Sequence, residues 1–259
     1  MSVPSNVVSM RDPQIPIDQG IYEESTTLKT QPGTRLRVGN KTFYYAKAGT
    51  ALVAGNVYCS PAFVATKNLE AAVALWTIAT GTAKTLSVTV GTDVAANAFA
   101  EGDLILASAA LSGGGIVYKI KSHGSIASAA AGSIVLYDDI PTSSVAAGPV
   151  CLIANQFNGV VLGSQLLDMP AGVAPIAVTS GNYAWLQTWG PAGVKQEAAT
   201  PAAAAVALGS TGGVIAAFTT GTLAGTGYGQ ANYILPIGKS MGLAATATQV
   251  NPVYLMITP

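Results

Sequence analysis

The feature that most limits the fold of this chain is a series of short β-favouring runs, each preceded by a glycine turn. Four such runs begin at residues 100, 113, 130 and 146, that is at intervals of 13, 17 and 16 residues, and fairly even spacing of this kind is typical of an antiparallel sandwich or barrel. They are AEGDLILAS at residues 100–108, GGGIVYKIKS at 113–122, AAGSIVLYDDI at 130–140 and AAGPVCLIANQ at 146–156. The pattern predicts a mainly β protein rather than a parallel α/β sheet.

Other segments also predict strands. Residues 35–38 and 41–45 flank Gly39-Asn40 and indicate a hairpin, because both runs are β-rich and the dipeptide suits a tight turn. TLSVTV at 85–90 alternates as a strand does, and VNPVYLMIT at 250–258 predicts a closing strand. Residues 66–79 fit strand alternation better than helical spacing, with a short helix capped by Thr66 as the alternative.

The first 30 residues differ from the rest of the chain. Residues 1–30 are polar and interrupted by prolines, and their apolar side chains are isolated rather than periodic. They predict an extended N-terminal arm, which is either a flexible tail or a segment that docks on a neighbouring subunit. Residues 31–259 form the predicted β-rich body, left open as one body or two subdomains dividing near residue 170. The candidate contacts of the arm with a neighbouring subunit are Ile15, Ile17, Ile21 and Tyr22.

Two of the three tryptophans lie beside a tyrosine in GNYAWLQTWGPAG, residues 181–193. Read as a strand that ends at Gly190-Pro191, this stretch places Tyr183, Trp185 and Trp189 on one face. The preferred interpretation is packing in the core or at a subunit interface, because aromatic rings bury the most area per residue. The alternative is an exposed platform on which a sugar stacks.

Charge is scarce: 9% of the residues are charged and the formal net charge is zero. A nucleic-acid surface needs clustered Lys and Arg, so a nucleic-acid partner is not expected. No apolar run approaches the roughly 18 residues of a membrane span, so a membrane partner is not expected either. A half-apolar chain with so few charges is instead expected to cover much of its surface with other protein.

Residues suited to chemistry are few and scattered. The single His123 precludes a site with several histidine ligands, and Cys59 and Cys151 are expected to be buried free thiols. The acidic residues show no paired spacing, and the glycine-rich segments 113–115 and 225–229 lack a phosphate-loop pattern. The sequence therefore predicts no catalytic, cofactor-binding or metal-binding residues.

Four stretches resemble a family of tailed-bacteriophage capsid decoration, or cement, proteins, which stabilise the phage head. Gly33-Thr34-Arg35, the aromatic run KTFYYAKAG at 41–49 and the turn LVAG at 52–55 are similar to the opening of that family. WLQTWG at 185–190 is similar to a later strand of the family. Residues 111–131, rich in Gly, Ala and Ser, depart from the family pattern.

The resemblance implies an antiparallel β-sandwich or barrel-like body that coats the capsid surface, commonly as a homotrimer. The partners implied are the major capsid protein and other copies of the chain, and the location is the virion. The start of the chain lacks a basic region followed by an apolar one, so synthesis in the host cytoplasm is expected. The function predicted is non-enzymatic cementing of a shell; the alternative is a receptor- or carbohydrate-binding module that uses the aromatic platform.

Overall fold

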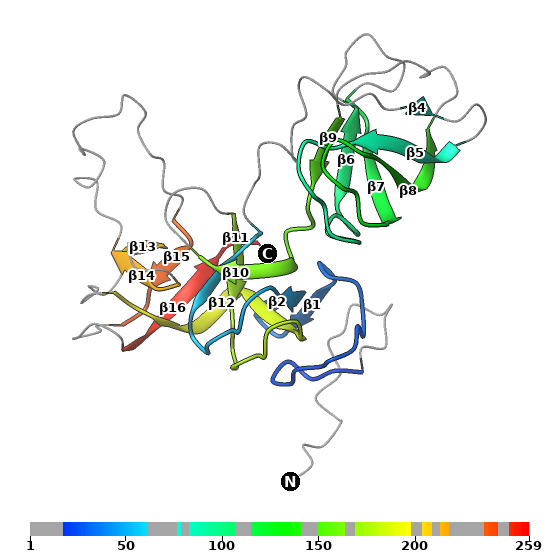
Figure 1. The fold of residues 1–259 in the computed structure, drawn as a ribbon. Coiled ribbons are helices and arrows are strands. Elements are labelled where there is room, and N and C mark those ends of the chain that lie inside the picture. Colours follow the sequence, from blue (N-terminus) through cyan, green and yellow to red (C-terminus); the bar gives the residue numbers. More distant parts are fainter. Residues whose placement is uncertain are drawn as a thin grey trace, which may run out of the picture. The chain divides into compact units, whose positions relative to one another are not determined.

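The computed structural model describes residues 18–61, 77–78, 83–106, 115–140, 150–163, 169–197, 204–208, 213–217, 236–242 and 249–258. Within these ranges the regular structure is entirely β, as the sequence predicts, and contains no helix (Figure 1). The chain forms two compact units. Unit 1 comprises Met1–Ala62 and Gln156–Pro259, and unit 2 comprises Phe63–Asn155.

Unit 1 is built on a closed ring of strands. Its sheet has ten strands in the order β1-β2-β10-β3-β11-β12-β16-β15-β13-β14, and β2 also pairs with β12. The additional pairing closes β2, β10, β3, β11 and β12 into a small barrel. The strands are β1 Arg35–Val38, β2 Lys41–Ala48, β3 Val57–Cys59, β10 Asn158–Leu162, β11 Pro170–Val173, β12 Tyr183–Lys195, β13 Ala205–Leu208, β14 Ile215–Ala217, β15 Gly238–Ser240 and β16 Val250–Met256.

Small side chains fill the barrel. A ring of five strands leaves a narrow interior, so the inward positions cannot all be large. Alanines supply many of them, and Tyr58, Val160 and Leu186 are the larger side chains that the barrel strands add to this cluster. The inward alanines from the barrel strands are Ala46, Ala48, Ala171 and Ala184. The richness in alanine is therefore partly a requirement of the closed sheet.

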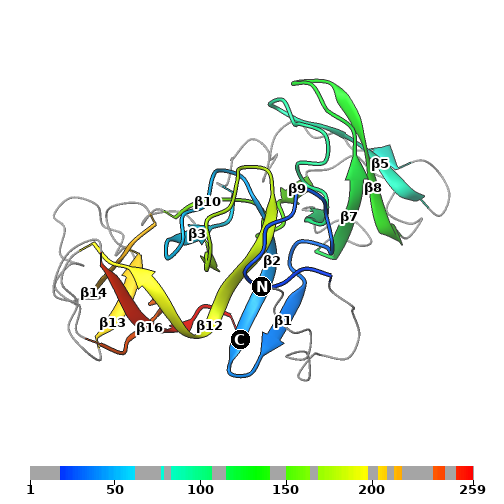
Figure 2. The same cartoon turned by 90° about the horizontal axis from the view of Figure 1, so that it is seen from below.

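β12 is the longest strand of the barrel and changes partners along its length. Its first half pairs with β2, and its second half, from Trp189, pairs with β16 (Figure 2). The prediction that Gly190-Pro191 ends this strand is wrong. Gly190 has a φ of 86°, and a Cβ there would lie 2.4 Å from the Asn40 carbonyl oxygen, so only glycine allows the close approach. The pairing of β12 with β2 ends at Trp189, so the missing N–H of Pro191 removes no hydrogen bond between these two strands.

A β-bulge between Gln187 and Trp189 interrupts the alternation of β12. An extra residue in one strand turns the following side chains to the opposite face. Trp185 consequently packs with Phe43 and Tyr45, whereas Trp189 packs edge-on against Tyr254, with 5.9 Å between ring centroids. The prediction of three rings on one face is therefore wrong for Trp189.

Strands β13 to β16 extend the sheet and cover one side of the barrel. Their apolar side chains pack against outward residues of β3 and β11, including Val57, Cys59 and Val173. The thiol of Cys59 is free and buried in this layer, as expected from the sequence. The predicted hairpin is also present: β1 pairs with β2 in the register Val38↔Lys41, and Gly39, with a φ of 61°, opens the two-residue turn.

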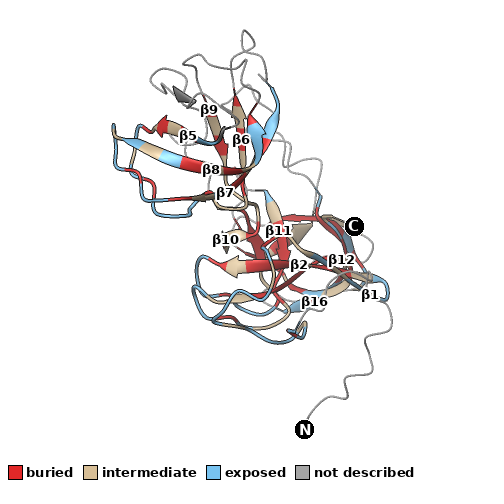
Figure 3. Ribbon diagram, turned by 90° about the vertical axis from the view of Figure 1, so that its right-hand side faces the viewer, coloured by how far each residue is buried: buried red, intermediate tan, exposed pale blue. Residues whose placement is uncertain are grey.

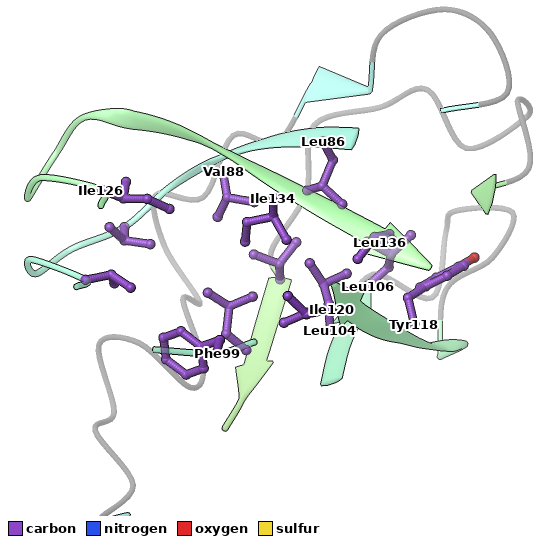
Figure 4. Close-up of a cluster of buried hydrophobic side chains, with 14 of the residues drawn as sticks. Leu86, Val88, Phe99, Leu104, Leu106, Tyr118, Ile120, Ile126, Ile134 and Leu136 are labelled. Carbon is purple, nitrogen blue, oxygen red and sulfur yellow. The ribbon is translucent and has the colours of Figure 1, made fainter. Parts of the chain in front are cut away.

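Unit 2 is a six-stranded sheet in the order β4-β5-β8-β7-β6-β9. The four evenly spaced runs of the sequence analysis are its strands β6, β7, β8 and β9. Their inward side chains form one apolar core with β5, in which Leu104, Ile120 and Leu136 are fully buried (Figure 4). The strands are β4 Thr77–Ile78, β5 Ala83–Thr89, β6 Asp103–Leu106, β7 Val117–His123, β8 Ala131–Ile140 and β9 Val150–Ile153. Residues 66–76, considered above as strand or helix, lie outside the described ranges.

Unit 2 is inserted into a hairpin of unit 1. β3 and β10 are antiparallel neighbours, with Cys59 opposite Val161, so the end of β3 lies beside the start of β10. In a simple hairpin a few residues would join them; here Phe63–Asn155 do so. The division near residue 170 is not observed, because Pro170 begins β11 inside unit 1.

Replacement of residues 63–155 by an Asn-Gly turn is expected to leave unit 1 folded, because β3 and β10 are already paired as hairpin strands. Far-UV circular dichroism should show β structure, and tryptophan emission should remain that of a buried indole. The separate fragment 63–155 should fold on its own core and serves as the complementary control. Unfolded or aggregated unit 1 would contradict an independent barrel.

Candidate interaction surface

A short segment from the predicted arm lies across the outer face of the barrel. Residues 18–30, here called the strap, cover the aromatic cluster of Phe43, Tyr45 and Trp185. The three rings are buried although they point out of the barrel, because the strap lies over them with Ile21, and Leu36 and Val38 of β1 pack against them as well. Burial in β2 and in the first half of β12 is visible in Figure 3.

Gln19 fastens the strap to the aromatic cluster. Its side-chain carbonyl accepts a hydrogen bond of 2.7 Å from the Tyr45 hydroxyl, and its backbone carbonyl accepts one of 3.3 Å from the Trp185 indole N–H. The Gln19 amide group donates to the backbone carbonyls of Glu23, at 2.8 Å, and Tyr183, at 3.1 Å. The Tyr45 hydroxyl and the Trp185 indole N–H therefore both have hydrogen-bond partners, so the rings can be buried without leaving an unsatisfied polar group.

The middle of the strap is held by backbone pairing and by one carboxylate. Ser25 and Tyr183 exchange two backbone hydrogen bonds, of 2.9 and 2.8 Å. The Glu24 carboxylate accepts hydrogen bonds from the Thr179 backbone N–H at 2.7 Å and from the Asn182 side-chain amide at 3.1 Å. The Thr179 N–H, followed by Asn182, lowers the pKa of Glu24 below its ordinary value.

The aromatic cluster extends to the edge of the strap. Tyr45 packs edge-on against Trp185 and stacks with Tyr183, with centroid distances of 5.0 and 5.9 Å. Burial raises the pKa of Tyr45, against the smaller opposing effect of the hydrogen bond from the Lys29 N–H. The Lys47 ammonium group lies 5.8 Å from the centre of the Tyr183 ring, within cation–π range.

The structure separates the residues that the sequence analysis grouped in the arm. Ile15 and Ile17 lie outside the described residues. Ile21 is half-buried and packs against the aromatic cluster of its own molecule; its contact with a neighbouring subunit stays a prediction. Tyr22 is 63% exposed on the strap and Leu28 is 54% exposed, so these two apolar side chains remain open for contact.

The three aromatic residues predicted for packing or a trimer seam lie in different surroundings. Trp185 is completely buried, so the platform of three exposed rings expected for a sugar-binding module is not present. Tyr183 is half-buried at the edge of the aromatic cluster. Trp189, also half-buried, belongs to a second surface on β12, β16 and β15.

This second surface, here called the apolar face, was missed in the sequence analysis. On β16 the outward side chains are Val250, Pro252, Tyr254 and Met256, with Val250 57% and Met256 44% exposed. On β12, Trp189 lies opposite Met256 and Pro191 lies opposite Tyr254. Met241 is exposed beside Pro252, and the Pro252 carbonyl accepts a hydrogen bond from the Met241 N–H. The charged residues of these three strands are Lys195 and Lys239, and none is acidic.

A signal for this face was present in the sequence. A sheet with one solvent-exposed side normally alternates apolar and polar residues. In VNPVYLM the positions of both parities are mostly apolar, a pattern typical of a strand that is covered on both sides.

His123 ends β7 and is buried. Its Nε2 accepts a hydrogen bond of 3.0 Å from the Phe99 backbone N–H, so Nδ1 carries the proton and donates to the Gly124 carbonyl at 2.7 Å. The Asn97 side chain accepts from the His123 N–H. With both ring nitrogens engaged, the side chain joins β7 to the turn before β6.

Other reactive side chains are dispersed. Among the described residues no three His, Cys, Asp or Glu side chains come together as a metal site would require. The thiol of Cys151 is free and half-buried on β9, and burial raises its pKa. Asp103 pairs with Lys119 at 3.2 Å on the surface of unit 2.

Comparison with family models, with curated proteins and with solved structures finds no match for this chain. In the part of the chain that the structure describes, no helix has the length and hydropathy needed to cross a membrane.

Gln19→Ala is expected to destabilise the strap by about 1–3 kcal/mol, because the buried Tyr45 hydroxyl loses its acceptor. Iodide should then quench tryptophan emission more strongly, since the covered Trp185 becomes accessible. Thr26→Ala, at an exposed position of the strap, is the control and should leave quenching unchanged. Equal quenching in both variants would show that Gln19 does not hold the strap.

Glu24→Gln tests the carboxylate contact through pH. Because folding lowers the pKa of Glu24, its stabilising effect is present above the ordinary glutamate value and is lost as the pH falls through the folded-state pKa. Wild type should therefore lose strap protection in acid, below about pH 4.3, by more than the variant does. Hydrogen exchange at residues 20–27, compared at neutral and acid pH, measures the difference. An identical acid response in the two proteins would exclude Glu24 as its source.

Proposed function

We propose that this chain is a structural virion protein that decorates a phage capsid. It binds between capsid subunits as a homotrimer and cements the shell. Its partners are the major capsid protein and other copies of itself, and its role is mechanical rather than enzymatic.

The observation that carries the proposal is the placement of the stretches that resemble the capsid-decoration family. The aromatic run at 41–49 includes β2, and WLQTWG at 185–190 lies in β12. These strands pair directly, with Tyr45 opposite Trp185 and Phe43 opposite Gln187. Two separated motifs thus form one structural element, as expected when a resemblance reflects a common fold rather than chance composition.

The surface also suits a cementing role. The chain is poor in charge, and the apolar face and the exposed Tyr22 and Leu28 are positions at which contact with protein would remove apolar area from water. A protein that binds only where two capsid subunits meet stabilises the assembled shell and not the free subunits. Weak individual contacts, repeated over the lattice, then strengthen the whole particle.

The second candidate function, a receptor- or carbohydrate-binding module, draws less support. Stacking on sugar needs exposed ring faces, and Trp185, the centre of the predicted platform, has none. Among the described residues the aromatic side chain with the greatest exposure is Tyr22, which stands without a second exposed ring beside it.

Addition of the purified chain to capsids of the encoding virus that lack it is expected to raise the melting temperature of the shell. Bound copies should number in the hundreds, counted by quantitative mass spectrometry. Deletion of residues 1–17 is expected to lower occupancy without changing the melting temperature of the free protein, because the strap remains. Virions that contain a few dozen copies or fewer, and capsids whose melting is unchanged, would contradict the cementing role.

A further inference from the structure

We propose, on the basis of the self-association suggested above, that the apolar face of one copy of this chain receives the strap of a second copy. Copies then associate head to tail, through two different surfaces of each molecule.

The apolar face has the composition of the centre of a protein interface. It combines Trp189, Tyr254 and Met256 with two prolines and Val250, and it extends about 20 Å along β16 and about 10 Å across the three strands. Tryptophan and tyrosine are enriched among residues that dominate binding, and charged residues are depleted there. The Trp189 and Tyr254 rings already pack together, so little side-chain freedom remains to be lost on binding.

Charge indicates the occupant. Lys195 and Lys239 stand at the margins of the face, and its three strands contain no carboxylate. The strap carries Asp18, Glu23 and Glu24 against the single Lys29, and it exposes Tyr22 and Leu28. An acidic segment with two exposed apolar side chains therefore complements an apolar face bordered by lysines.

The same comparison disfavours contact between two identical faces. A two-fold contact would set two faces against each other that both carry lysines and no carboxylate on their strands, so neither face would supply an opposite charge. Contact between strap and face instead sets opposite charges against each other.

The strap cannot occupy the face of its own molecule. Ser25 is paired with Tyr183 at the start of β12, whereas the face begins at Trp189, about 20 Å further along an extended strand. Gln19 and Glu24 also hold the strap at the first of these positions. The occupant is therefore the strap of another copy.

A head-to-tail contact has two different surfaces, so each can be disabled separately. The face variant is Val250→Glu with Met256→Glu, and the strap variant is Tyr22→Glu with Leu28→Glu; all four side chains are exposed, so each variant should fold. Met169→Glu is the matched control, because Met169 is 51% exposed but lies beside β3 and β11. Circular dichroism confirms folding, and sedimentation equilibrium of the full chain gives the mass.

Wild type and Met169→Glu are expected to form a closed oligomer, and the face and strap variants are each expected to be monomers. An equal mixture of the two variants should form a one-to-one dimer, because one intact strap meets one intact face and no second junction can form. The proposal would be overturned if both variants had the oligomeric mass of wild type, or if the strap variant alone had it. Either result would still be compatible with a trimeric cement protein. A monomeric wild type would overturn it directly, and capsid binding would then decide the proposed function separately.

Discussion

The pairing of β2 with β12 is the contact on which the rest of unit 1 depends. Without it the five strands would form an open sheet, and the alanines of its inner face would have no enclosed interior to fill. The same pair places Tyr45 beside Trp185 on the outside and so creates the aromatic cluster that the strap covers. Beyond the bulge, β12 carries β16 and with it the apolar face. The interior, the strap and the face are thus three consequences of one long strand and its partners.

The scarcity of charge has more than one cause in this structure. Unit 1 has apolar layers inside the barrel, beneath the strap and beneath β13 to β16, and unit 2 has a core of its own. Several separate layers in a chain of this length leave fewer positions for charged residues than a single core would. Low charge alone therefore overstates how much of the surface other proteins must cover. The apolar face is more specific, because its exposed positions are apolar in strands that could have alternated.

Sequence patterns were sufficient to predict local structure, but they could not predict which distant strands pair. The β1–β2 hairpin and strands β5 to β9 follow from alternation and turn residues, which act over a few neighbours. The insertion of unit 2 could not be predicted in this way, because Cys59 and Val161 become neighbours only across the whole of that unit. The bulge near Thr188 was also missed, since it depends on the register with β2, and it moved Trp189 from the predicted aromatic face to the apolar face. For the arm, the sequence identified apolar side chains but could not tell that Ile21 faces its own barrel while Tyr22 faces outward.

The strap connects the fold to the proposed association. A free peptide with the same side chains would lose much conformational entropy on binding. The strap has already lost this entropy during folding, because Gln19, Ser25 and Glu24 hold it in place with Tyr22 and Leu28 exposed. A head-to-tail contact ends in a ring only if its rotation closes, and otherwise it continues as a filament. A rigid strap fixes that rotation, because its position relative to β12 is set inside each molecule. The hydrogen bonds that bury Trp185 would therefore also determine whether copies of the chain close into a trimer.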